Sequence, residues 1–417
     1  MRILKLTPQT EAKLLRFREN EDREALEAAS TIVTDVRRNG DAALERWSCK
    51  LDGTNLRRDG CWIPRRDLAA ARERVSAEFL RAIAHAFENV RRVAQKQLLR
   101  DWVLQVEPGV KIAQLVRPID SIGCYIPGGR FALVSTLVMT VVPAQVAGVR
   151  RIVAVCPHPN DELLAAADLL GVTEMARVGG AQAIAALAYG TKSVQRVEKV
   201  FGPGNRYVTA AKQLVSAECA IDLPAGPTEA IVLANSGNAA WIAADLLAQA
   251  EHAPDAASYL VTSSAAFAKK IQQEVRQQLK TLPADNPAQF SIRKTGAILV
   301  ARSWKEACSF VNRFAPEHLS LPEKSAGLLP AIRNAGTVFC GPWSAQPFGD
   351  YASGSNHVLP TGGWARRRGG LSVLDFVKCV SVQTISQKGY ERPANDVEVL
   401  ARAEGLEAHA RAVEVRR

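Results

Sequence analysis

The spacing of apolar residues divides the chain into a mostly helical first hundred residues and a longer region of alternating strands and helices. In the first part, apolar residues recur at helical intervals among charges of both signs, at 17–47 and again from Pro64 to Lys96. A turn at Asp52-Gly53 separates the two blocks. From about residue 119, short apolar runs appear between helical segments, which indicates a change of architecture.

These apolar runs form two series. The strands predicted in the first series are residues 121–125, 151–156, 174–178 and 197–201. Those of the second are residues 230–233, 259–262, 297–301 and 337–340. Strands that alternate with helices form βαβ units with parallel sheets. We therefore predict an α/β protein with two domains of similar design, near residues 119–225 and 230–341.

The last 45 or so residues follow neither pattern. After Pro393 they show a helical pattern at Val397–Val415, with an apolar stripe that includes Leu400, Leu406 and Val413. A segment of this length cannot enclose a core of its own. We expect it to pack on another part of the assembly.

Composition excludes several classes of protein. Hydrophobic residues make up 47% of the 417 positions and charged residues 23%, which is ordinary for a globular protein and excludes a disordered chain. Eight cysteines lie far apart without a CxxC pair, so they indicate buried thiols in a reducing compartment. No targeting segment or membrane span is predicted, and we expect a cytoplasmic location.

The net charge of +11 raises the question of an anionic partner. Positive residues are spread along the chain, and only Arg366-Arg367-Arg368 forms a tight run. No aromatic residues alternate with this run and no nucleic-acid motif is present. Attraction of an anionic cofactor is therefore the use that we expect for the excess charge.

Two pairs of polar residues stand at helix ends. Gln249 and His252, three residues apart before Pro254, share one face at the end of a helix, where an amide oxygen and an imidazole can bind a divalent metal. Glu317 and His318 lie at a helix-to-strand turn, a position suited to proton transfer near neutral pH. The alternatives are an ordinary polar helix face and a solvated loop pair.

Two further segments carry candidate chemistry. Asp350 and His357 lie in a loop rich in glycine and serine, which is typical of a site, although an Asx turn and a buried structural histidine are alternatives. In the tail, His409 falls on the apolar helix face, where a buried histidine is the alternative to a ligand. Gly405 can interrupt this helix, so Glu404 is assigned to no face.

Two glycine turns, YIPGG and FGPGN, follow strands and precede helices. This position suits phosphate or carboxylate binding at a helix N-terminus. Neither turn is GxGxxG, and no acidic residue follows at the expected spacing, so a standard dinucleotide fingerprint is absent. The P-loop, GxSxG and HExxH motifs are also absent, which disfavours a P-loop ATPase, a serine hydrolase and a zincin.

Taken together, these segments form a series of motifs. They are CYIPGG at 124–129, GGAQAIAALAYGT at 179–191, VFGPGNRYV at 200–208, LPAGPTEA at 223–230, LLAQAEH at 246–252, NRFAPEHL at 312–319, GDYASGSNHVLPTGG at 349–363, GLSVLDFVK at 370–378 and EGLEAHARAV at 404–413. In these motifs, and in their order along most of its length, the chain resembles the zinc-dependent histidinol dehydrogenases.

The resemblance implies a role for each matching residue. The implied zinc ligands are Gln249, His252, Asp350 and His409. The implied catalytic pair is Glu317 and His318. The implied substrate contacts are Thr228, Gln249, His252, His318, Asp350, Glu404 and His409. The implied NAD contacts are Tyr125, Gln182 and Asn205. Thr228 stands where serine is common in the family, and it keeps the hydroxyl.

The resemblance also implies an architecture. It consists of two incomplete Rossmann-like domains with parallel sheets, and of small helical N-terminal and C-terminal extensions. The implied units are an N-terminal helical extension at 1–22, a discontinuous α/β domain at 23–120 and 230–371 with most of the zinc and catalytic site, an inserted NAD-contacting domain at 121–229 and a tail at 372–417. The tail is expected to pack on the other subunit of a homodimer and to complete its active site.

The implied activity is the oxidation of L-histidinol through L-histidinaldehyde to L-histidine, with two NAD reduced and one zinc bound per subunit. His318 suits removal of the alcohol proton, and Glu317 suits activation of water in the aldehyde step. Three alternatives stay open. They are a related dehydrogenase of another small alcohol, such as a sulfonated diol, a zinc hydrolase and a non-catalytic basic binding protein.

Overall fold

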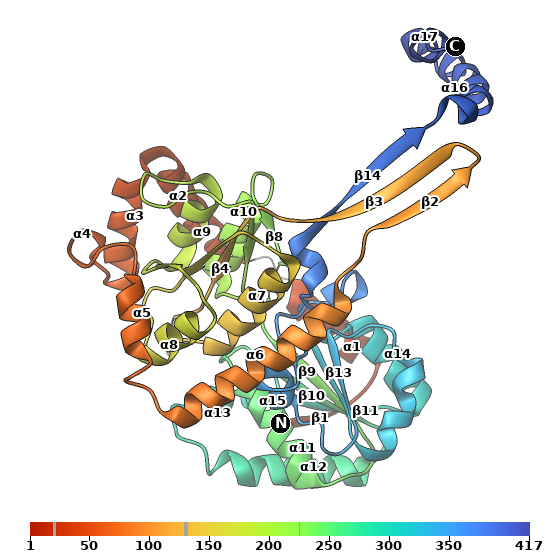
Figure 1. Cartoon of the computed structure of the whole chain (residues 1–417). Helices are drawn as coiled ribbons and strands as arrows, with labels where there is room; N and C mark the ends of the chain where they lie inside the picture. Colours follow the sequence, from red (N-terminus) through yellow and green to blue (C-terminus); the bar gives the residue numbers. More distant parts are fainter. Residues whose placement is uncertain (20–21, 129–131, 225) are drawn as a thin grey trace.

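The chain forms two α/β lobes and a long arm that carries the C-terminus (Figure 1). The computed structural model describes residues 1–19, 22–128, 132–224 and 226–417. Its sheets have five, six and three strands, and the two larger sheets are parallel throughout. The predicted fold, an α/β protein with two parallel sheets, is therefore confirmed.

The five-stranded sheet has the order β6-β5-β4-β7-β8. Its strands are β4 (Ser121–Tyr125), β5 (Arg151–Val155), β6 (Glu174–Ala176), β7 (Lys199–Phe201) and β8 (Ala220–Ile221). The flanking helices are α7 (Val134–Ala147) and α8 (Asp161–Leu169) on one face, and α9 (Gly180–Tyr189) and α10 (Arg206–Val215) on the other. The strand order reverses between β4 and β7, which creates the crevice where open α/β sheets bind ligands.

The six-stranded sheet has the order β1-β11-β10-β9-β12-β13. Its strands are β1 (Arg2–Lys5), β9 (Glu229–Leu233), β10 (Ala257–Thr262), β11 (Ala297–Val300), β12 (His318–Leu321) and β13 (Thr337–Cys340). The helices α11 (Ala239–Ala250), α12 (Ala265–Leu279) and α13 (Ala288–Lys294) cover one face, and α1 (Pro8–Glu19) and α14 (Trp304–Phe314) cover the other. The segment 1–22, predicted to be a helical extension, thus begins with an edge strand of this sheet.

Residues 23–97 form helices that pack on the five-stranded sheet. They are α2 (Arg23–Asn39), α3 (Asp41–Trp47), a π-helical turn (Ser48–Asp52), α4 (Leu56–Asp59), α5 (Arg65–Ala71) and α6 (Ala77–Gln97). The stripe Ala25, Ala29 and Val36 of α2 shares a core with α9 and α10, because small side chains let these helices approach closely. The domain boundaries, including the grouping of 23–120 with 230–371, stay a prediction.

The arm is a three-stranded antiparallel sheet that the sequence pattern did not predict. Its strands are β2 (Trp102–Glu107), β3 (Val110–Pro118) and β14 (Val377–Ile385), with β3 in the centre. At its tip, α16 (Glu391–Ala403) and α17 (Glu407–Glu414) form a helical hairpin away from both lobes (Figure 1). Gly405, with φ of +75°, separates the two helices, as predicted.

Apolar side chains are exposed along the arm and its tip. Val103 is 69% exposed on β2, and Val399 and Leu400 on α16 are 68% and 64% exposed. At the tip of the arm, the backbones of Gly109 and Gly389 are in contact. A Cβ on Gly109 would lie 2.6 Å from the Cα of Gly389, so there is no room for a side chain between the two segments. An exposed apolar surface of this kind marks a site of association.

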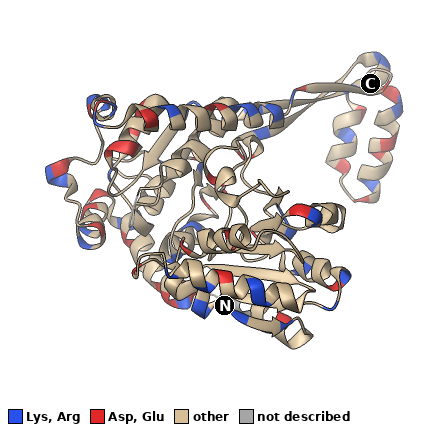
Figure 2. Ribbon diagram, turned by 90° about the horizontal axis from the view of Figure 1, so that it is seen from below, with Lys and Arg blue, Asp and Glu red and all other residues tan. Residues whose placement is uncertain are grey.

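The surface carries basic and acidic residues side by side on most helices (Figure 2). Within the basic run, Arg368 donates to Asp375 at 2.7 Å, and the Arg367 guanidinium lies over the ring of Trp364. All eight cysteines are free, as the sequence predicted, but Cys49 and Cys379 are exposed and not buried. No helix in the described part of the chain is long and apolar enough to cross a membrane.

Candidate active site

The turn between α14 and β12 positions the predicted acid–base pair. Ala315 ends α14 in the left-handed region at φ of 51°, and Pro316 prevents a further helical turn. Glu317 and His318 therefore reach the amino end of β12, where they are 7% and 4% exposed. The predicted helix-to-strand turn is confirmed, and the alternative of a solvated loop pair is wrong.

A chain of hydrogen bonds holds Glu317. The amide of Gln249 donates to the Thr228 hydroxyl at 2.5 Å, and this hydroxyl donates to Oε2 of Glu317 at 2.5 Å. The backbone N–H of Glu229 donates to the same oxygen at 2.9 Å. The segment 228–229, which is itself held by Gln249 of α11, thus fixes the carboxylate of a residue far along the chain.

Burial shifts the pKa values of Glu317 and His318 in opposite directions. It raises the pKa of Glu317 to about 7, although the hydrogen bonds from Thr228 and the Glu229 backbone oppose this change. Burial also lowers the pKa of His318 to about 4, so its imidazole is neutral at pH 7. Its Nδ1 lies 3.6 Å from Oε2 of Glu317 and has no hydrogen-bond partner among the described residues. A neutral imidazole and a carboxyl that titrates near neutrality can both accept protons.

Three of the predicted zinc ligands lie beside this pair. Gln249 is on the last turn of α11, but the helix ends at Ala250, so His252 lies in the turn that follows and not on the predicted helix face. Asp350 is on α15 (Gln346–Tyr351), which packs on α11. The charge of Asp350 interacts with His252 and His318, and burial raises the pKa of the Asp350 carboxyl. Amide oxygen, imidazole and carboxylate are donors that zinc accepts.

The tail residues lie elsewhere. Glu404 and His409 are exposed on the hairpin at the tip of the arm, away from the two lobes (Figure 1). A buried structural histidine, the alternative to the ligand role of His409, is therefore not found in a single copy of the chain. His357, in contrast, is adjacent to the site, where its Nδ1 donates to the backbone carbonyl of Asp350 at 3.1 Å. This contact fits its alternative role as a structural histidine.

The predicted cofactor contacts meet at one edge of the five-stranded sheet. Tyr125 ends β4, and its hydroxyl accepts from the backbone N–H of Gly180 at 3.2 Å. Gln182 is fully buried, and its Oε1 has no partner in the described part of the chain. Asn205 caps α10 by accepting from the backbone N–H groups of the next turn at 3.0 and 3.1 Å. Gly129 and Ala225, which belong to two of the motifs, lie outside the described residues.

A buried ion pair, which sequence reasoning missed, holds the turn FGPGN. Lys212 pairs with Asp222 in the core, and Gly202 donates its N–H to Asp222 at 2.7 Å and accepts from Lys212 at 2.8 Å. A Cβ on Gly202 would lie 2.1 Å from the carbonyl oxygen of Tyr125, so only glycine fits. No local pattern marks this pair, because a lysine within an amphipathic helix normally faces solvent.

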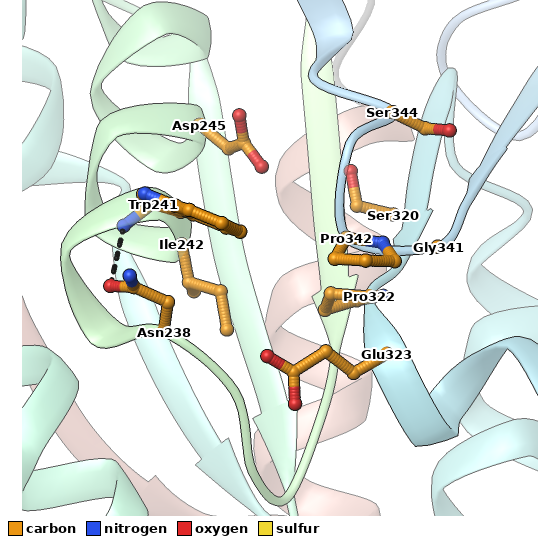
Figure 3. A pocket seen from close by; sticks show the side chains of 10 residues that line it. All are labelled: Asn238, Trp241, Ile242, Asp245, Ser320, Pro322, Glu323, Gly341, Pro342 and Ser344. Atoms are coloured by element: carbon orange, nitrogen blue, oxygen red, sulfur yellow. Dashed lines mark hydrogen bonds between the residues drawn. The ribbon is translucent and has the colours of Figure 1, made fainter.

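A separate small pocket opens at the carboxyl edge of the six-stranded sheet, between α11 and β12 (Figure 3). Asp245 and Ser320 face each other across it, and none of the predicted site residues lines it. Burial raises the pKa of the Asp245 carboxyl to about 6. The predicted chemistry is at the opposite edge of this sheet.

Helix N-termini follow the strands of one sheet, and a buried acid–base pair lies beside metal-type donors at the other. These are the features expected of a two-domain α/β oxidoreductase. The sequence matches the family model described as histidinol dehydrogenase over residues 15–417. The chain belongs to the histidinol dehydrogenase family.

Individual relatives agree over nearly their full length. The chain is 44% identical to histidinol dehydrogenase of Geobacillus kaustophilus over 410 residues, which cover 97% of this chain and 96% of the relative. It is 42% identical to the Methanothermobacter thermautotrophicus protein of that name, over 93% and 92% of the two chains. The crystal structure of histidinol dehydrogenase from Elizabethkingia anophelis superposes with a TM-score of 0.93 at 35% identity, covering 100% of this chain and 98% of that one.

Proposed function

We propose that the chain oxidises L-histidinol through L-histidinaldehyde to L-histidine, with one NAD reduced in each step and with zinc in the site. Membership of the family makes the chain an oxidoreductase of histidine biosynthesis. The observation that carries the proposal is the buried pair Glu317 and His318, which lies beside Gln249, His252 and Asp350.

The donor set of this site fits zinc. Gln249, His252 and Asp350 would hold the metal, and His409 from a second copy would supply another imidazole. When bound, zinc would hold and orient the substrate nitrogens. The unpartnered Nδ1 of His318 shows that this part of the site has polar atoms still to be satisfied.

The crevice of the five-stranded sheet fits NAD. The buried, unpartnered Oε1 of Gln182 offers an acceptor at this place. We propose that Gln182 binds the cofactor together with Tyr125 and Asn205, whose Nδ2 is not needed for the helix cap. When bound, NAD would supply the hydride acceptor of each oxidation.

The two residues of the pair take different protons. In the first oxidation, neutral His318 removes the proton of the substrate alcohol as the carbon loses hydride. In the second, the carboxylate of Glu317 takes a proton from the water that adds to the aldehyde. Thr228 holds that carboxylate by its hydroxyl and also contacts Gln249, so it links the acid–base pair to the metal ligands.

The arm provides the basis for a homodimer. Its exposed apolar residues, including Val103, Val399 and Leu400, are suited to cover a second copy. We propose that residues 372–417 pack on the partner subunit and bring Glu404 and His409 to its site. We also propose that residues 121–229 carry the cofactor contacts, and that the enzyme acts in the cytoplasm.

One assay tests the activity. Purified protein is incubated with limiting L-histidinol and excess NAD, and the absorbance at 340 nm is followed to completion. Two NADH per histidinol are expected, together with loss of activity on treatment with a chelator and its return with zinc. Faster oxidation of another small alcohol, or ester hydrolysis without NADH, would instead support the alternative dehydrogenase or the hydrolase.

A further inference from the structure

The crevice of the five-stranded sheet lacks the acidic residue that commonly follows the second strand of a dinucleotide-binding unit. In such units a carboxylate at that position binds the ribose hydroxyls. Here β5 is followed by Cys156, Pro157 and His158, and the first acid beyond them, Asp161, pairs with Arg74 at 2.7 Å. The unit itself therefore offers no free carboxylate next to its glycine turns.

A carboxylate reaches this place from outside the unit. Asp52 ends the π-helical turn Ser48–Asp52, and Gly53, with φ of 67°, terminates it. The Gln182 amide donates to Oδ2 of Asp52 at 2.9 Å, and the backbone N–H of Gly179 also donates to this carboxylate. Single π-helical turns of this kind are frequent at functional sites.

The surroundings of Asp52 are those of a ligand-binding group. Burial raises its pKa, and the nearby His158 opposes that change. Among the described residues no lysine or arginine forms an ion pair with it. Tyr125 lies close enough for the charge of Asp52 to raise the pKa of the tyrosine hydroxyl. Asp52 is thus a half-buried carboxylate that no described lysine or arginine pairs with, and it lies next to two proposed cofactor contacts. Its structural partners use only part of its hydrogen-bonding capacity.

We propose that Asp52 binds the adenosine ribose hydroxyls of NAD and excludes NADP by repelling its 2′-phosphate. This inference rests on the proposed function, because it assumes that NAD occupies this crevice. The guanidinium of Arg206, the first residue of α10 after the turn FGPGN, is already paired with Asp22 and Glu24 at 3.1 Å each, so it is not free to bind a phosphate. Hydroxyl groups donate to a carboxylate, whereas a dianionic phosphate is repelled by one.

Binding of NADH and of NADPH to the apoprotein, followed by nucleotide fluorescence, tests the inference without turnover. Wild type is expected to bind NADH at least tenfold more tightly than NADPH. Asp52→Asn should weaken NADH about tenfold, the effect of losing hydrogen bonds to a charged acceptor. The same substitution should leave NADPH binding unchanged or make it tighter, so the ratio of the dissociation constants of NADPH and NADH should fall toward one. Asp52→Glu, which keeps the charge, should retain exclusion of NADPH.

The matched control is Asp59→Asn, because Asp59 is an exposed aspartate of α4 paired with Arg58. Thermal unfolding verifies that each variant is folded, and Asp52→Ser replaces Asp52→Asn if that protein does not fold. Equal weakening of NADH and NADPH in Asp52→Asn, or an unchanged ratio, overturns the inference. Wild type that binds neither nucleotide contradicts the proposed function itself, so the two failures are distinguishable.

Discussion

The hydroxyl of Thr228 donates a hydrogen bond of 2.5 Å to Oε2 of Glu317, although 89 positions separate the two residues. Their proximity follows from the parallel pairing of β9 with β12, in which Ala230 is opposite His318. The residues just before the two strands therefore meet at the amino edge of the sheet. This contact stabilises the charged form of the carboxyl and lowers its pKa.

Removal of the Thr228 hydroxyl should shift the pH profile of aldehyde oxidation. The base is active when deprotonated, and the hydrogen bond favours that form, so Thr228→Val should raise the pKa of Glu317 above about 7. The rate should fall at pH 7, with the acid limb moved up by about one pH unit. Thr228→Ser keeps the hydroxyl and should retain the wild-type profile. An unmoved limb in Thr228→Val would contradict this assignment.

The two members of the acid–base pair should fail in different half-reactions. His318→Asn should slow oxidation of histidinol about a hundredfold or more, because the alcohol proton loses its acceptor. Glu317→Gln should have its larger effect on histidinaldehyde, where water must be activated. Each variant is assayed separately with both substrates. Equal losses on both substrates in both variants would refute the division of roles.

Two inactive variants should regain activity when they are mixed, if each active site is shared between two subunits. His409→Ala and His252→Ala are mixed, and subunits are allowed to exchange. Half the dimers are then mixed, and each has one site with both histidines, so activity should return to about a quarter of wild type. Each variant exchanged with itself is the control. No recovery, despite demonstrated exchange, would mean that His409 does not serve a partner's site.

Asn205 has two roles that substitution can separate. Its Oδ1 caps α10, so Asn205→Ala should lower stability by about 1 kcal/mol, while Asn205→Ser keeps a capping oxygen. Both changes remove the amide donor and should raise the Michaelis constant for NAD about fivefold to tenfold. Urea unfolding and steady-state kinetics measure the two effects. An unchanged Michaelis constant in both variants would exclude Asn205 as a cofactor contact.

Asp245 should make the fold less stable as pH rises. Its folded pKa of about 6 lies above the ordinary value of 3.8, so the folded state binds the proton more tightly and loses stability between those two pH values. Asp245→Asn should therefore raise the free energy of unfolding by on the order of 1 kcal/mol at pH 7.5. The gain should vanish near pH 4. The exposed Asp120→Asn is the control, and an equal gain at both pH values would contradict the argument.

The strands of both large sheets could be predicted because they are buried on two faces. All five residues of β9 (Glu229–Leu233) are buried, so the strand is marked by a continuous apolar run. In β14 every residue after Val377 is exposed, so no continuous apolar run marks this strand, and the sequence pattern did not predict the arm. The apolar stripe of α2 likewise predicted that this face of the helix is buried, but it did not specify against which sheet the helix packs.

The local part of the site could also be predicted. The three-residue spacing of Gln249 and His252 at a helix end, and the adjacency of Glu317 and His318, are visible in the sequence, although the helix ends two residues before His252. Contacts set by strand register or by a distant helix were not visible. The bond from Gln182 to Asp52 spans 130 positions and depends on how α9 packs against the helical first hundred residues.

The contact between Gly109 and Gly389 lies where the C-terminal helices join the arm. Each glycine occupies the space that the other's Cβ would need, so the direction in which α16 leaves the arm is set by backbone against backbone. Since α16 and α17 extend from this point, a small change in the backbone direction at Gly389 produces a larger shift in the position of His409. The position of His409, a proposed zinc ligand, thus depends on two glycines that contact no substrate or cofactor. Alanine at either glycine would change the direction of α16 and α17 without altering any proposed site residue.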